Sequence, residues 1–147
     1  MAGSVWLRLA TDRLVRADRI VDLDLWGPES SIGAQQKTAV LPGGPARIMV
    51  RMDGTTGWLR AATCASERGG ALVAQLAVAS SDAGTRSCEG ARFVYGLMAE
   101  DGLLIRWTHG PKIPHGNGQV PPLHAAADMH DGLKVRPLWK RGPVPTS

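Results

Sequence analysis

Residues 47–80, RIMVRMDGTTGWLRAATCASERGGALVAQLAVAS, predict two strands, a turn and a helix in succession. Ile48, Val50 and Met52 occupy alternate positions, and Arg47 and Arg51 face the other way, which is the period-two pattern of a half-buried strand. The Asp-Gly pair that follows favours a tight turn. Residues 58–64 are therefore expected to return as the second strand of a hairpin.

The second half of this stretch predicts one helix, over residues 66–80. Ser66 is a favourable N-cap, because its hydroxyl oxygen can accept a hydrogen bond from a free N–H group of the first turn. Two glycines near the start weaken the helix by about 1 kcal/mol each relative to alanine, so it must depend on packing against the sheet. The expected apolar stripe consists of Leu72, Val73, Leu76 and Ala77.

Alternating apolar residues predict further strands on both sides of this unit. They cover residues 5–9, 14–26, 93–97 and 103–107, and residues 14–26 form either one strand or two short strands with a bulge. The expected fold is α+β, a small, curled, antiparallel sheet of about six strands in the order β-β-β-β-α-β-β, covered by one packed helix. A favourable Asp-Gly hairpin turn at residues 101–102 supports the last pair.

The chain divides into an organised part and an irregular part. Residues 1–108 are expected to form a single α+β domain, since a chain of 147 residues suits one domain of ordinary size. Residues 27–46 form a long connector rich in Gly, Pro and Ser, and a connector of this length is either mobile or functional. Residues 109–147 are dense in Gly, Pro and His and end in an extended basic arm.

Bulk chemistry indicates a cytoplasmic protein, or a virion component if a phage encodes it. Charged residues interrupt every apolar run among residues 1–25, which argues against a secretory signal, and residues 71–79 are too short to span a bilayer. No membrane partner is therefore expected. Thirteen arginines against four lysines are typical of proteins encoded by GC-rich bacterial genomes. Cys64 and Cys88 are expected to be small buried hydrophobic residues rather than a disulfide bridge.

The positive charge is concentrated at the C-terminus. The chain carries 17 Lys and Arg against 13 Asp and Glu, a net charge of +4, and residues 132–147 hold four cations and no acid. This arm can place cations on phosphates and its tryptophan on a base, anchor on a protein partner, or act only as a solubilising tail. The candidate contacts are Lys134, Arg136, Trp139, Lys140 and Arg141.

Tryptophan supplies five of the seven aromatic residues. Trp6 and Trp26 fall on, or close to, the faces opposite the main apolar stripes of their predicted strands. If no helix covers those faces, the two rings form an exposed aromatic patch of the kind that marks interaction surfaces. The alternative is that tryptophan fills the core that a single Phe and a single Tyr leave underfilled.

All four histidines lie in one segment of the chain. Neutral imidazole is a good zinc ligand, and an aspartate stands one helical turn after the third histidine. The candidate metal ligands are His109, His115, His124, Asp128 and His130. Their spacing matches no established zinc pattern. The alternative is that the histidines are ordinary exposed loop residues, and no cofactor is expected.

Residues 21–25, VDLDL, place two carboxylates on one face of a predicted strand. With Gly3-Ser4 upstream, this string resembles the nucleotidyltransferase pattern of a Gly-Ser turn followed by alternating acids, which implies that Asp22 and Asp24 hold Mg²⁺. The chain departs from that pattern because residues 5–9 predict a strand where the family has a helix. The alternative is the solvated face of an edge strand, where charges oppose aggregation.

Three functional hypotheses remain open. Nucleophile elbows, phosphate-binding loops and zinc-protease motifs are absent from the sequence, which lowers the expectation of an enzyme. The leading hypothesis is a non-catalytic protein-interaction or assembly module of bacterial or phage origin, which contacts a protein partner or its own copies through residues 27–46 and the C-terminal arm. The alternatives are nucleic-acid binding through the basic arm and a metal-dependent enzyme that uses the histidine segment.

Overall fold

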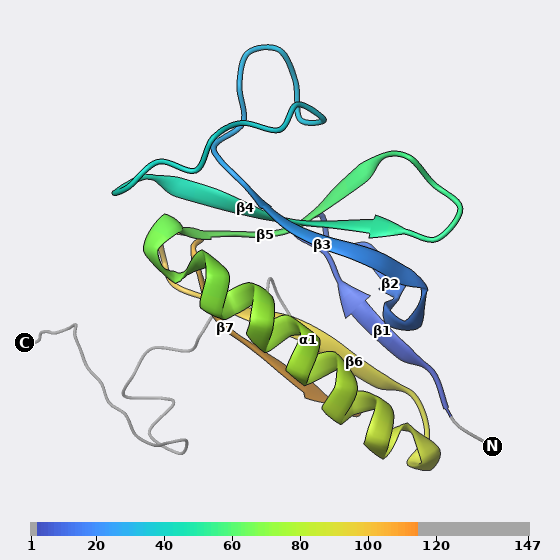
Figure 1. Cartoon of the computed structure of the whole chain (residues 1–147). Coiled ribbons are helices and arrows are strands. Elements are labelled where there is room, and N and C mark those ends of the chain that lie inside the picture. The colour runs from blue at the N-terminus through green and yellow to red at the C-terminus, as the bar shows by residue number, and fades with distance from the viewer. Residues whose placement is uncertain (1–2, 115–147) are drawn as a thin grey trace, which may run out of the picture.

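The computed structural model describes residues 3–114, and residues 1–2 and 115–147 lie outside the described part (Figure 1). The described part contains one α-helix and three short 3-10 helices. The helical elements are η1 (Ala17–Arg19), η2 (Ser66–Arg68), α1 (Gly69–Arg86) and η3 (Ser87–Glu89). The strands are β1 (Val5–Arg8), β2 (Leu14–Arg16), β3 (Ile20–Trp26), β4 (Pro45–Met52), β5 (Trp58–Ala65), β6 (Arg92–Met98) and β7 (Leu104–Gly110).

The strands form two sheets, with α1 packed against both (Figure 1). The four-stranded sheet has the order β2-β1-β6-β7, and the three-stranded sheet has the order β3-β4-β5. This confirms the expected α+β class with one packed helix. It also divides what was expected to be one sheet, because η1 breaks residues 14–26 into two strands that belong to different sheets. The described strands therefore number seven rather than about six.

One strand pair departs from the antiparallel rule. The β1 and β6 strands run parallel, with Leu7 beside Val94, whereas the other pairs between strands of residues 3–114 are antiparallel. Parallel neighbours need a long connection, and here that connection is the whole three-stranded sheet together with α1. The β7 strand also continues to Gly110, beyond the boundary expected at residue 108.

The core lies where the two sheets and α1 meet. Alternation places one side of each strand there, as predicted for Ile48 and Val50, and both are fully buried. Leu72 and Leu76 of α1 complete the same cluster. Both cysteines are free, and Cys64 is buried within this core as expected. Cys88 is exposed, which corrects its expected burial. Among the described residues, no helix is long and apolar enough to cross a membrane.

The helix differs from its prediction in both its start and its length. It begins at Gly69 after η2, and no side-chain bond caps it, so Ser66 is not the N-cap. It continues to Arg86 because buried Ala79 and Ala83 extend the packed side by a further turn. Ala77, predicted to be on the apolar stripe, is exposed.

Gly69 and Gly70 provide a matched test of this packing. Alanine at either position favours the helix by about 0.5 kcal/mol or more. At Gly70 the added methyl group meets nothing within 4 Å, so we expect Gly70→Ala to raise the free energy of unfolding. At buried Gly69 the methyl group would overlap the Leu25 side chain, so Gly69→Ala should lose most or all of that gain.

Urea denaturation of the two variants measures the difference. Equal stabilisation at both positions would show that the Leu25 contact does not fix the start of the helix.

Candidate protein-interaction surface

The connector between β3 and β4, residues 27–44, covers one face of the three-stranded sheet. It lies on the opposite side of this sheet from α1 (Figure 1). Strand register explains the division, because Trp26 is paired with Arg47 and both alternate with the core residues Leu25 and Ile48. The side of the sheet turned away from α1 is therefore covered by loop rather than by helix.

Arg47 holds this loop in place. Arg47 is only 3% exposed, and its guanidinium donates three short hydrogen bonds to loop carbonyl groups. Nε donates to the Gly27 oxygen at 2.7 Å, Nη1 to the Ala34 oxygen at 2.9 Å and Nη2 to the Gln36 oxygen at 3.0 Å. The same guanidinium lies 5.3 Å from the Trp26 ring centroid. One buried cation thus fixes three separate points of the loop.

Gln35 and Lys37 add a second set of contacts between the loop and the sheet. The Gln35 amide nitrogen donates to the Trp58 carbonyl oxygen at 2.7 Å, and its Oε1 accepts from the Trp58 N–H at 2.8 Å. Lys37 pairs with Asp24 at 2.9 Å, and the Trp26 indole N–H donates to the same carboxylate at 3.0 Å. Burial raises the pKa of Asp24, but the hydrogen bonds from Lys37, Trp26 and the Leu25 N–H lower it more. The pKa of Asp24 is therefore below its usual value.

The end of the loop packs closely against Gly27, its first residue. The Gly27 N–H donates to the Thr38 carbonyl oxygen at 2.9 Å, and a side chain at Gly27 would overlap the Ala39 carbonyl group. Glycine is therefore required at this position. The ring centroids of Trp26 and Trp58 lie 5.4 Å apart beneath the loop.

Large apolar side chains remain exposed on this ordered loop. Ile32 is 78% exposed, Leu41 is 56% exposed and Val40 is 38% exposed. Single exposed apolar side chains are ordinary on a protein surface, but three within ten residues of one fixed loop are a candidate contact. We call Ile32, Val40 and Leu41 the loop surface.

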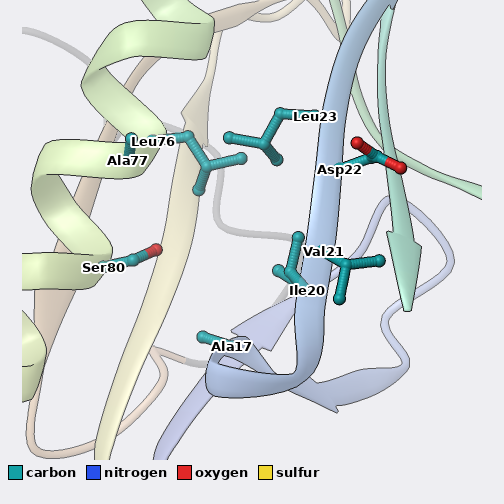
Figure 2. Close-up of a pocket in the computed structure, with 8 residues that line it drawn as sticks. All are labelled: Ala17, Ile20, Val21, Asp22, Leu23, Leu76, Ala77 and Ser80. Carbon is teal, nitrogen blue, oxygen red and sulfur yellow. The ribbon is translucent and has the colours of Figure 1, made fainter. Parts of the chain in front are cut away.

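A groove of about 370 Å³ lies between β3 and α1 (Figure 2). Ile20, Leu23 and Leu76 point toward one another in it, while Ala77 and Ser80 of the helix line it and Val21 points away. Within residues 3–114, β4 is the only strand that pairs with β3, so the other edge of β3 borders the groove. An edge strand beside an apolar groove can accept an extended segment of a partner as a further strand.

The structure separates the two tryptophans predicted to form a patch. Trp26 is 3% exposed and lies under the loop, which corrects its expected position on the surface. The register of β3 would place it outside the core, but the loop covers that side. Trp6 lies on the other sheet, half-buried, and its indole N–H donates to Ser4 Oγ at 2.9 Å.

The C-terminal arm and most of the histidine segment lie outside the described residues. This applies to Lys134, Arg136, Trp139, Lys140 and Arg141, and to His115, His124, Asp128 and His130. His109 is described, and its Nδ1 lies 3.0 Å from Arg92 Nη2. Within residues 3–114, no group of three or more His, Cys, Asp or Glu side chains is placed to hold a metal ion.

The paired carboxylates on β3 are engaged by cations of the protein itself. Arg51 Nε donates to Asp22 Oδ2 at 2.9 Å, and Lys37 pairs with Asp24. Because β3 is an edge strand within the described part, these contacts support the interpretation of a solvated strand face. Val5–Arg8 is a strand, so the departure from the nucleotidyltransferase pattern noted in the sequence is confirmed.

Sequence reasoning missed Arg47. The available signal was a lone arginine before the apolar residues 48–50, directly after a long Gly- and Pro-rich connector. A buried guanidinium needs several acceptors, and the carbonyl groups of an irregular connector can supply them.

Comparison with models of known protein families, with curated proteins and with solved structures finds no match to this chain.

Replacement of Arg47 by lysine tests its role in the loop. Lysine keeps the charge but cannot reproduce the planar fork, so buried carbonyl groups lose their donors. We expect Arg47→Lys to lower the free energy of unfolding by about 2–3 kcal/mol and to speed hydrogen exchange at the Gly27 amide.

Arg51→Lys is the matched control, because Arg51 lies on the same strand and pairs with a half-exposed carboxylate. Its effect should stay below about 1 kcal/mol in the same urea titration. Equal losses in the two variants would contradict the role given to Arg47.

His109 predicts a measurable pH dependence of stability. Burial lowers the pKa of His109, and Arg92 lowers it further, against a smaller opposing effect of Asp82. The unfolded chain therefore takes up this proton first, and the free energy of unfolding falls as the pH drops below the ordinary value of 6.5. His109→Gln should make stability less dependent on pH between about pH 7 and pH 5, as measured by denaturation at a series of pH values. An unchanged slope would refute this assignment.

Proposed function

We propose that this chain is a non-catalytic protein-interaction or assembly module that contacts its partner through the loop surface. The observation that carries the proposal is the combination of a buried arginine that orders residues 27–38 with apolar side chains exposed on the same loop. The guanidinium of Arg47 donates its hydrogen bonds to carbonyl groups of this loop and not to groups in the core.

Preorganisation supports this function energetically. A loop that is already fixed loses little conformational entropy when a partner binds, so more of the contact energy appears as affinity. Ile32 and Leu41 are apolar anchors of the kind that central interface contacts use. The interface need not include buried Trp26 or half-buried Trp58, which support the loop from beneath.

The groove between β3 and α1 is a second candidate contact of the same module. It faces the other side of the three-stranded sheet from the loop, with the edge of β3 beside it. A partner that added a strand there would satisfy backbone groups at that edge and place alternate apolar side chains against Leu23 and Leu76. The C-terminal arm, proposed from the sequence as a further contact, lies outside the described residues.

Site-specific photo-crosslinking in cells tests the loop contact. A photoreactive amino acid replaces Ile32 or Leu41 in the full chain, and a matched variant carries it at Glu100, an exposed residue in the turn between β6 and β7. We expect a discrete crosslinked product, of a second copy or of another protein, from the two loop positions and none from the control.

Mass spectrometry of the product identifies the partner, and the same reagent at Ala77 tests whether the groove belongs to the interface. Absence of product at both loop positions, or equal products at all positions, would reject the proposal.

A further inference from the structure

The face of the four-stranded sheet that is turned away from α1 carries aromatic and basic side chains. Strand register places Trp6 directly beside Arg16 on β2 and beside Phe93 on β6. On the same side, one step further along the strands, the Arg8 guanidinium lies 5.9 Å from the Tyr95 ring centroid. Their neighbours Leu7 and Val94 point to the opposite side and are fully buried in the core.

The aromatic residues on this side are ones that would ordinarily be expected to pack in the core. The chain contains only one Phe and one Tyr, and both lie on this face rather than in the core. Phe93, Tyr95 and Trp6 are all partly exposed. Trp6 and Phe93 are neighbours across a strand pair, and Tyr95 follows Phe93 by about 7 Å along β6.

Cations accompany these rings. The Arg16 guanidinium lies 5.5 Å from the Trp6 ring centroid, and Arg106 is exposed opposite Leu97 at the β7 edge. Asp18 pairs with Arg16 at 2.8 Å and offsets its charge, Arg106 is exposed, and Arg8 is 9% exposed and lies beside Tyr95. The strand positions on this face supply no acid. We call Trp6, Phe93, Tyr95, Arg8, Arg16 and Arg106 the aromatic face.

We propose that the aromatic face binds single-stranded nucleic acid. Flat rings in two adjacent strands offer stacking surfaces to successive unpaired bases, and every base has a face that can stack. Arg16 and Arg106, the partly exposed and the exposed arginine of this face, contact the phosphates, and an arginine already stacked on a ring can add to base stacking. A duplex is a poor occupant, because its bases are already stacked on one another.

This function is separate from the proposed protein contact. The loop surface and the aromatic face belong to different sheets, so either one can fail without the other. It also differs from binding through the C-terminal arm, because it depends on aromatic rings of the described domain. A polyanionic protein segment would fit the charge but has no use for the rings.

Fluorescence anisotropy with the full chain provides the test. The probe is a labelled oligothymidylate of about twelve nucleotides, and the controls are an abasic strand of equal length and charge, a duplex and a polyglutamate peptide. We expect the oligothymidylate to bind at least about tenfold more tightly than the abasic strand, with an affinity that falls as salt rises.

Two pairs of variants locate the binding. Phe93→Leu keeps an apolar side chain but removes the ring, and should weaken oligothymidylate binding about tenfold without changing abasic binding, while Phe93→Trp restores it. Arg106→Ala should reduce the salt slope by about one, whereas Arg86→Ala, which removes an exposed arginine at the end of α1 on the opposite side of the sheet (Figure 1), should leave it unchanged. Thermal unfolding confirms that each variant is folded, and Arg106→Ala tests the face without touching its packing.

Four results would overturn the proposal. They are no binding at about 100 µM protein in low salt, equal affinity for the abasic strand or polyglutamate, an unchanged affinity in folded Phe93→Leu, and equal effects of Arg106→Ala and Arg86→Ala. Alanine at the four arm cations, Lys134, Arg136, Lys140 and Arg141, separates the two sources of charge. It should reduce the salt slope yet leave the preference for bases over the abasic strand, and loss of that preference would assign the stacking to the arm instead.

Discussion

The buried guanidinium of Arg47 determines how the three-stranded sheet uses its second face. A charged group with 3% exposure is tolerated only when its donors are satisfied, and here loop carbonyl groups satisfy them. The dependence runs both ways, because the irregular residues 27–38 lack a sheet ladder and need these donors for their own backbone. Trp26 can be buried outside the main core only because this loop is held over it.

The consequence is a protein of two unequal layers. The main core lies between the sheets and α1, where apolar alternation alone explains the packing. The second layer, under the loop, is held instead by hydrogen bonds, one ion pair and the contact between the tilted Trp26 and Trp58 rings. A polar layer specifies one loop conformation more strictly than apolar contacts do, since each misplaced donor leaves a buried group unsatisfied. This is why the loop can expose Ile32 and Leu41 without collapsing onto them.

The parts of the fold that were predictable from sequence depend on local physics. Alternation at Ile48, Val50 and Met52 and the Asp-Gly turns located the strands and hairpins, because period and turn chemistry act over a few residues. The parallel pairing of β1 with β6 was not predictable, because residues 5 and 92 are far apart in the sequence and become neighbours only when the intervening chain has folded. The length of α1 and the role of Arg47 were missed for the same reason. The local sequence around Ala83 and Arg47 does not indicate their roles, because these depend on contacts with residues distant in the sequence.

The placement of the rare aromatic residues follows from the same division. Small and aliphatic side chains fill most of the main core, with Trp107 as its only large ring among the described residues. The single Phe and Tyr then contribute to the opposite side of the four-stranded sheet, where Arg8 and Arg16 approach the rings. A ring beside an arginine stays partly hydrated and keeps a flat surface for a ligand, whereas an aliphatic side chain there would offer only apolar area. Within residues 3–114, the outer side of the four-stranded sheet therefore carries rings and arginines, whereas the outer side of the three-stranded sheet carries the connector (Figure 1).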